Sequence, residues 1–153
     1  MAPLGLRNNN PLNIRFSPRS NWIGQTGENK GFCVFDSLEH GFRAAFKLLN
    51  NYIKQGYDTV PKIISRWAPQ SENNTTAYID FVLADAANAL RLRSCSFDDA
   101  CFRYLRITKD YELFAVSFSM MKMELGYSSL NGDDKLRVNT AFEAAKSKYN
   151  FVK

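Results

Sequence analysis

One nearly uncharged run, LFAVSFSMMKMELGY from Leu113 to Tyr127, is long enough for about four helical turns. At helical spacing its side chains fall on two adjacent apolar stripes, made of Leu113, Val116, Ser117 and Met120, and of Phe114, Phe118, Met121 and Leu125. A helix that is apolar nearly all round is buried by its neighbours. We therefore expect a central, buried helix that ends before Gly126, because glycine commonly terminates helices.

Glu124 is the one carboxylate in this run, and it lies at the C-terminal end of the predicted helix. Burial among apolar side chains disfavours an ionised carboxylate, and so does the negative end of the helix dipole. Both effects predict a raised proton affinity, and a carboxylic acid that stays protonated is the general acid that glycosidases use. The alternative is a glutamate at the frayed, solvated end of a core helix.

Composition predicts one folded domain over residues 1–153, because the chain is 45% hydrophobic and 14% aromatic. The N-terminus has no apolar signal segment, and no run of about 18 apolar residues occurs, so we expect no leader and no membrane span. The net charge of +5 favours an anionic partner such as an acidic wall polymer, a phospholipid surface or nucleic acid. Because the basic residues form no run, nucleic acid is the weakest of these.

The sequence lacks the motifs of nucleotide-binding proteins, zinc proteases and serine hydrolases. No glycine-rich phosphate loop, HExxH, paired CxxC or GxSxG is present. Three cysteines without metal-ligand spacing predict neither a metal site nor another cofactor, and Cys101 on an apolar stripe indicates a buried free thiol. Cys33 and His40 imitate a thiol-protease pair without its signature, so we expect His40 to be a surface or packing residue.

The pattern of turns and helices gives the fold class. Residues 1–36 are rich in turn formers and hold short extended candidates at 13–16, 22–24 and 32–35, which predicts a small β-hairpin region. Helices are expected from Asp36 to Gly56, from a Thr59 cap to Ala68, over 76–90, over 96–105, from Thr108 to Leu125, and from Asp133 to Tyr149. Asp36 and Glu39 have capping-box spacing. The prediction is a mainly α (α+β) domain with about six helices around one buried central helix.

Two sequence motifs resemble those of a known protein family. The turn RNNNPLNIRF from Arg7 to Phe16 is followed by a Trp-x-Gly at Trp22 and then by GFCVFDSLEHGFRAAFKLL. This order resembles the sugar-binding hairpin of bacterial cell-wall glucosaminidases. It is even more similar to a group of phage and prophage virion-associated peptidoglycan hydrolases of lysozyme-like fold, related in pattern to lytic transglycosylases. The segment from Trp67 to Ile79 resembles a further motif of that group.

The same group carries a buried glutamate helix near its C-terminus, and MMKMELGYSS resembles that segment with Glu124 in the glutamate's place. The resemblance therefore implies a circularly permuted lysozyme-like fold. Two departures are Leu12 where the group usually has glycine and Leu125 where it has asparagine. Residues 129–153 have no counterpart in the resemblance.

The resemblance implies cleavage of the β-1,4 glycan backbone of peptidoglycan, of lysozyme (muramidase), lytic transglycosylase or glucosaminidase type, with Glu124 facing the asparagine turn as the catalytic acid. The second reacting group is the substrate's own 6-hydroxyl or acetamido group, or a water activated by Asp36, Glu39 or Glu72. The residues expected to contact sugar are Asn10, Asn13, Arg15, Trp22, Trp67 and Tyr78. Each also has a structural explanation: helix capping for Glu39, loop hydrogen bonds for Glu72, and core packing for the aromatic side chains.

The implied partners are peptidoglycan glycan strands, together with a virion, a secretion-system component or an immunity protein. Without a signal of its own, the protein is expected to be made in the cytoplasm. A holin, a virion or a secretion system then delivers it to the periplasm or cell wall, as a phage lysin or an antibacterial effector. The runner-up is a non-catalytic wall-binding component of a virion or secretion apparatus with the same fold. A third class, a basic helical protein that binds nucleic acid, has little support from the scattered charge.

Overall fold

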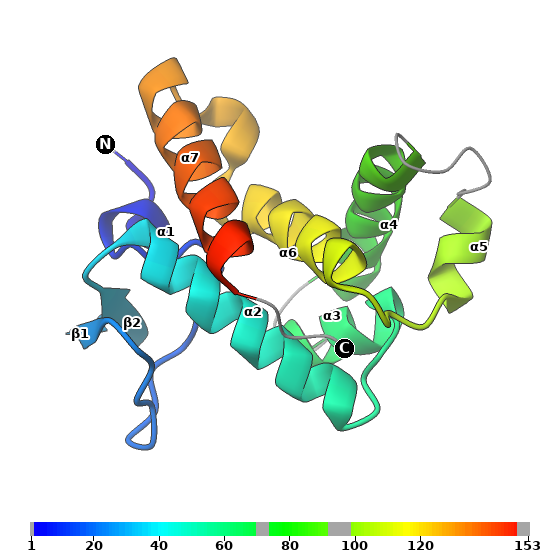
Figure 1. The fold of residues 1–153 in the computed structure, drawn as a ribbon, viewed down its shortest axis with the longest axis horizontal. Coiled ribbons are helices and arrows are strands. Elements are labelled where there is room, and N and C mark those ends of the chain that lie inside the picture. Colours follow the sequence, from blue (N-terminus) through cyan, green and yellow to red (C-terminus); the bar gives the residue numbers. More distant parts are fainter. Residues whose placement is uncertain (1, 70–73, 92–98, 150–153) are drawn as a thin grey trace. The chain divides into compact units, whose positions relative to one another are not determined.

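The computed structural model describes residues 2–69, 74–91 and 99–149, with backbone only for residue 91 and for 99–101. Within these ranges the chain is mainly helical and has one two-stranded antiparallel sheet (Figure 1). This confirms the predicted α+β class. None of the helices in the described ranges combines the length and the apolar character that a membrane crossing requires.

The secondary structure follows the predicted order. Its elements are α1 (Leu4–Arg7), β1 (Gln25–Asn29), β2 (Phe32–Phe35), α2 (Leu38–Lys54), α3 (Val60–Trp67), α4 (Thr75–Arg91), α5 (Asp99–Tyr104), α6 (Asp110–Leu125), the 3-10 turn η1 (Tyr127–Ser129) and α7 (Gly132–Lys148). The six predicted helices are α2 to α7, and the short α1 was not predicted. Ser96, expected to open α5, lies outside the described residues.

The chain divides into two compact units. The first, here the hairpin unit, contains residues up to Lys47 and those from Met120 to Asn150, and the second, here the helical unit, contains Leu48–Ser119. Both α2 and α6 run through the division. The expectation of one domain stays a prediction.

The hairpin in the hairpin unit is closed by a two-residue turn. Gln25 pairs with Phe35 and Asn29 with Phe32, and Lys30 and Gly31 between the strands both have positive φ, 54° and 88°. Positive φ at both central residues is the geometry of a type I′ turn, whose twist matches that of the strands. The strand at 32–35 agrees with the prediction, whereas its partner is 25–29 rather than 22–24.

The last helix supplies core to the hairpin unit. In Figure 1, α7 lies across the first half of α2. Phe142 of α7 makes edge-to-face contacts with Phe42 and Phe46 of α2, at ring-centroid distances of 5.3 and 5.9 Å. Asn131 caps α7 by accepting a hydrogen bond from the backbone N–H of Asp134. Residues 129–148, which the resemblance did not explain, therefore complete this core.

The start of α2 differs from the prediction. Ser37, not Asp36, caps the helix, because its hydroxyl accepts from the backbone N–H of His40 at 3.2 Å. Asp36 instead pairs with the ring of His40, and Glu39 pairs with Lys148 at 3.2 Å. The predicted capping box of Asp36 and Glu39 is therefore wrong.

Other helix ends follow the predicted chemistry. Thr59 caps α3 by accepting from the backbone N–H of Lys62, and Pro61 lies in its first turn. Asn74 caps α4 in the same way, accepting from the backbone N–H of Ala77 at 3.1 Å. The Thr59 cap was predicted from the sequence and is confirmed.

Among its described residues, the helical unit has an apolar core and two buried carboxylates, Asp58 and Glu112. The core is lined by Val60, Ile63, Ile64, Val82, Leu83, Ala86, Leu90, Phe102 and Leu113. Asp58 is 6% exposed and accepts from Arg106 at 2.8 Å, with Lys62 3.6 Å away. Burial acts to raise the pKa of Asp58, but the hydrogen bond and charge of Arg106 outweigh it, so the pKa lies below its usual value.

Candidate active site

Glu124 lies in the last turn of α6, next to the final helical residue, Leu125. Its side chain is half-buried, whereas Leu125 is buried and Met123 is exposed. Gly126 has a φ of 60° in the left-handed region and ends the helix as predicted. The carboxylate is therefore neither in open water nor sealed inside the core.

Asn13 holds this carboxylate from the N-terminal turn. Its Nδ2 donates to Glu124 Oε1 at 3.1 Å and also to the backbone oxygen of Glu124 at 3.3 Å. Asn13 has a φ of 53°, a conformation that asparagine tolerates better than most residues with a side chain. One amide thus joins the asparagine turn to the end of α6 across 111 residues of sequence.

Gly5 sets the distance between these elements. A Cβ on Gly5 would lie 2.7 Å from Asn13 Oδ1, 2.7 Å from Leu125 Cδ2 and 2.8 Å from the backbone oxygen of Asn10. The turn and the end of α6 therefore reach their positions only because this residue has no side chain. The sequence interpretation missed Gly5, although a glycine just before the asparagine run was the signal that pointed to it.

The oxygen of the Asn13 amide has no hydrogen-bond partner among the described residues, although it is buried. A buried acceptor without a donor costs free energy, so native proteins rarely keep one without a reason. The site thus presents both an unused acceptor and a half-buried carboxylate.

Asn10 has a different place from the one predicted. It is fully buried, its Nδ2 donates to the backbone oxygens of Ile14 and Cys33, and its Oδ1 accepts from the backbone N–H of Ile14. Since both amide hydrogens are donated inside the turn, Asn10 has none for a sugar. Its predicted contact with substrate is not supported, and its role is to hold the turn.

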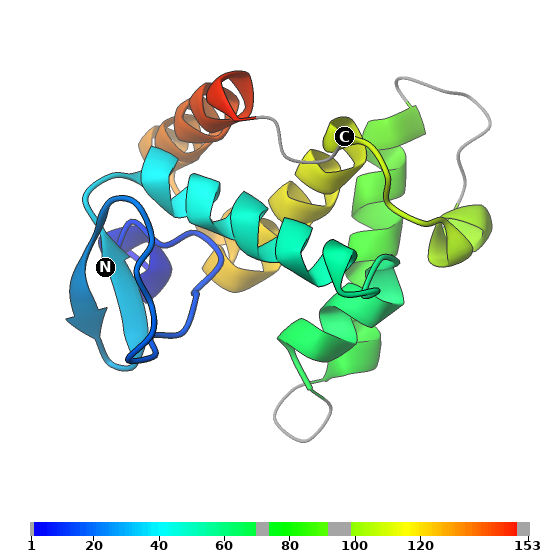
Figure 2. The same cartoon turned by 60° about the horizontal axis from the view of Figure 1, so that its bottom comes forward.

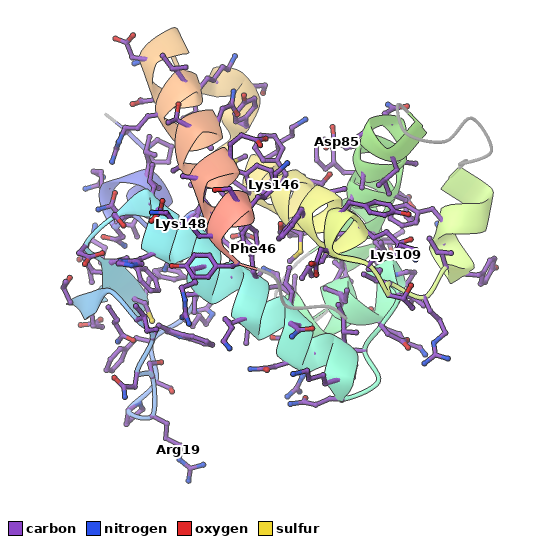
Figure 3. All side chains as sticks on the ribbon, in the orientation of Figure 1. Arg19, Phe46, Asp85, Lys109, Lys146 and Lys148 are labelled. Carbon is purple, nitrogen blue, oxygen red and sulfur yellow. The ribbon has the colours of Figure 1, made fainter. Side chains whose placement is uncertain are left out.

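Arg15 and Trp22 are accessible. Arg15 is exposed, and its guanidinium carbon lies 5.3 Å from the centre of the Phe32 ring. Trp22 is half-buried, and its backbone N–H donates to the side chain of Gln25. Figure 3 shows Arg19, between these two residues, extending away from the ribbon. The loop therefore carries an accessible arginine and a partly accessible tryptophan, and in Figure 2 it continues into the hairpin.

Trp67 and Tyr78 belong to the helical unit. Trp67 is the last residue of α3 and is half-buried, while Tyr78 in α4 is only 6% exposed. Tyr78 is therefore a core residue, the structural explanation already considered for it, and the predicted stacking of a sugar on it is not supported. For Trp67 the contact with sugar stays a prediction.

The predicted second carboxylates have partners of their own. His40 Nδ1 lies 2.6 Å from Asp36 Oδ1, and this hydrogen bond lowers the pKa of Asp36. Glu39 binds Lys148, as described above. Glu72 lies outside the described residues. Neither of the two described carboxylates is thus set aside to activate a water.

Cys33 does not form the thiol–imidazole pair that the sequence imitates. It is a buried free cysteine whose thiol donates to the backbone oxygen of Arg15, and burial raises its pKa despite a hydrogen bond with Ser20. His40 uses its Nδ1 on Asp36. A thiol with a raised pKa is a poor nucleophile. The side chain of Cys101 lies outside the described residues.

Comparison with known proteins gives a limited result. No family model matches the chain. The chain is 42% identical over 86 residues to Protein P5 of Pseudoalteromonas phage PM2. The match covers 53% of this chain and 54% of that protein, so the similarity spans about half of each. Similarity to a phage protein is therefore shown for part of the chain.

These findings overturn the family that the sequence motifs suggested. The curated protein that the chain matches over about half its length is Protein P5 of phage PM2, whose name gives no sign of a lysozyme-like hydrolase. The backbone supplies a physical reason for the misleading motif. Asn9 and Asn13 both have positive φ, 54° and 53°, and Asn10 ties the turn together. Asparagines at these positions are explained by the conformation of the turn alone.

Proposed function

We propose that this protein is a glycosidase that cleaves the β-1,4-linked glycan backbone of peptidoglycan, with Glu124 as its general acid. The observation that carries the proposal is the half-buried carboxylate at the end of α6, held by Asn13 from the turn. A general acid must be partly withdrawn from water and yet reachable by the oxygen that it protonates. Glu124 meets both conditions.

The Asn13 amide suits an acid that loses and regains a proton. Its N–H group donates to Glu124 Oε1 in the structure, a contact that an ionised carboxylate accepts. If the amide turns over, its oxygen accepts from the protonated carboxyl group instead. The Asn13 amide can thus orient Glu124 in both its ionised and its protonated form, and it does so without adding a charge to the site.

The reaction needs a second group at the anomeric carbon. Because Asp36 and Glu39 are paired elsewhere, we assign this role to the substrate. The Glu124 proton passes to the glycosidic oxygen as the C–O bond breaks, and the 6-hydroxyl or the acetamido oxygen of the same sugar attacks the anomeric carbon. Attack by the hydroxyl leaves a 1,6-anhydro end and returns its proton to the Glu124 carboxylate. Attack by the acetamido oxygen leaves an oxazolinium ion, which a water molecule opens to a reducing end while its proton returns to the Glu124 carboxylate.

Sugar binding falls to the loop of the hairpin unit. The half-buried Trp22 presents ring surface of the kind that packs on a pyranose, and the exposed Arg15 supplies hydrogen-bond donors for hydroxyl or acetamido groups. Similarity to a phage protein supports a phage lysin, delivered to the wall by a virion or a holin, over a secreted effector.

The test is digestion of purified peptidoglycan by wild type and by Glu124→Gln. A general acid contributes about 10²- to 10⁴-fold, so the variant should lose that much activity. Asn13→Gly, which removes the amide and tolerates the positive φ of this residue, should lose less. The matched control is Glu143→Gln, the same change at an exposed glutamate of α7 that pairs with Lys146, and it should leave digestion unchanged.

Other results have definite meanings. Equal digestion by wild type and Glu124→Gln would place the acid elsewhere. Sedimentation of the wild type with peptidoglycan, without release of fragments, would refute the enzyme and leave a wall-binding component. Mass spectrometry of released fragments separates anhydro ends, which attack by the 6-hydroxyl leaves, from reducing ends, which water leaves either directly or by opening an oxazoline formed by the acetamido group.

A further inference from the structure

A concave surface of about 490 Å³ lies on α3, within the helical unit. It is lined by Tyr57, Pro61, Lys62, Ser65, Arg66 and Pro69. An aromatic ring, two prolines and two cations form this lining, which we call the Arg66 pocket. The combination of apolar walls with cationic donors is typical of sites that bind an anionic group on an apolar body.

Arg66 is held in place by aromatic rings. Its guanidinium carbon lies 5.3 Å from the ring centre of Tyr57 and 5.8 Å from that of Tyr52. The two rings are themselves in edge-to-face contact at 6.2 Å. Cation–π contact orients a guanidinium group without using up its N–H donors. Arg66 is thus ordered and still able to donate.

The charge of Arg66 is not neutralised within the described part of the chain, where no carboxylate lies within ion-pair distance of it. Arg66 is also exposed. An exposed arginine that aromatic rings hold in one geometry needs little further ordering to bind a carboxylate through two parallel hydrogen bonds.

A second positive charge stands nearby. Lys62 has a side chain that is 58% exposed and lies 3.6 Å from Asp58. Asp58 already accepts from Arg106 at the shorter distance of 2.8 Å, so Arg106 rather than Lys62 is the main counter-charge of Asp58. Lys62 and Arg66, both in the lining, therefore give the pocket a net positive potential.

We propose that the Arg66 pocket binds a carboxylate of the peptidoglycan stem peptide, with Arg66 as the bidentate donor and Lys62 as the second cation. The apolar wall of Tyr57 and the prolines takes the adjoining aliphatic part of the peptide. The lining holds two cations, which match a single anionic group, whereas nucleic acid is bound by a track of many cations along its phosphates. The identity of the ligand rests on the proposed function, but the pocket and its charge do not.

The test is a binding titration with the full chain carrying Glu124→Gln, so that turnover does not interfere. The probe is the soluble muropeptide N-acetylglucosaminyl-N-acetylmuramyl-tripeptide, and chitobiose is the matched sugar without carboxylates. Amide resonances of α3 in heteronuclear NMR spectra report the site directly. We expect saturable shifts at Lys62, Ser65 and Arg66 with the muropeptide and none with chitobiose.

Substitutions test whether Arg66 is the donor that binds the carboxylate. Arg66→Gln should weaken muropeptide binding about ten- to hundredfold, the loss expected for one charge-assisted hydrogen-bonded contact. Arg103→Gln is the matched control, since Arg103 is a partly exposed arginine of the same unit that already pairs with Asp80 at 3.1 Å. The control should bind as tightly as the parent chain.

The proposal is overturned if α3 shows no saturable shift, if chitobiose binds as tightly as the muropeptide, or if both arginine variants weaken binding equally. Tighter binding of an octathymidylate at these resonances than of the muropeptide would also overturn it, in favour of nucleic acid. Digestion assays keep the two proposals apart, because Arg66→Gln in the otherwise wild-type chain should still cleave glycan from which the peptides have been removed.

Discussion

Replacing Phe142 by alanine tests whether α7 is an integral part of the hairpin unit. Phe142 is 6% exposed and packs its ring edge-to-face against Phe42 and Phe46. Removing a buried phenylalanine side chain costs about 3–5 kcal/mol, through lost burial and the cavity left behind. Since small domains have a total stability of about 5–15 kcal/mol, this loss is a large share of it.

Phe142→Leu separates the two contributions. Leucine keeps most of the apolar volume but loses both ring contacts, each worth about 0.5–1.5 kcal/mol beyond the buried area. We therefore expect a loss of about 1–3 kcal/mol for this variant. Leu136→Ala is the matched control in the same helix, because Leu136 is 66% exposed and should change stability by no more than about 0.5 kcal/mol.

Urea unfolding followed by tryptophan fluorescence measures these values unit by unit. The chain has two tryptophans, Trp22 in the hairpin unit and Trp67 in the helical unit. In a Trp67→Phe background, Trp22 alone reports the unit that contains Phe142. A cost below about 1 kcal/mol for Phe142→Ala, or an equal cost for Leu136→Ala, would show that α7 is not part of this core.

Two further predictions concern backbone packing and charge. Gly41→Ala should destabilise the hairpin unit by about 1–3 kcal/mol, because its Cβ would collide with the backbone oxygen of Asn9, whereas Gly27→Ala, whose Cβ meets open space, should be nearly neutral in the same urea assay. Asp58 has a pKa lowered by folding, so its stabilising effect is present above the unfolded pKa of about 3.9 and is lost as the pH falls through the folded value. Asp58→Asn should therefore lower the urea midpoint at pH 7 and make the midpoint fall less steeply as the pH drops. The control is Asp80→Asn, at an exposed ion pair, which should not alter the shape of the profile of midpoint against pH. Parallel profiles for wild type and Asp58→Asn would contradict the role assigned to Asp58.

Local chemistry made several elements predictable. The helix that begins after Thr59 was readable because a threonine cap and a proline in the first turn act within a few residues. Gly126 ended α6 for the same kind of local reason. The predicted apolar stripes of α6 are also buried or half-buried along the helix.

Other features were hidden because the deciding contact is distant or ambiguous. Asp36 and Ser37 are both good caps, and the choice between them depends on which one the ring of His40 engages. The hairpin turn is Lys30-Gly31, and lysine carries no preference for the positive φ that this turn requires. At such positions two local conformations have similar energies, so the sequence alone does not distinguish them.

The candidate site was predictable in part. Glu124 stood out as one carboxylate in an apolar run, and the asparagine turn stood out by composition. The hydrogen bond between Asn13 and Glu124 joins residues 111 positions apart, and no local rule specifies it. Nor did any local rule distinguish Asn10, which is buried in the turn, from Asn13, which faces the carboxylate.

The hairpin unit is assembled from both ends of the described chain, with the helical unit inserted between them. During synthesis the inserted segment leaves the ribosome as a continuous piece and can fold early, since domains tend to form as units in the order of translation. The asparagine turn has to wait for the segment that begins at Met120 before Glu124 reaches it. The hydrogen bond between Asn13 and Glu124 therefore forms only after the helical unit has been synthesised, and the candidate site is one of the last features of the fold to be completed.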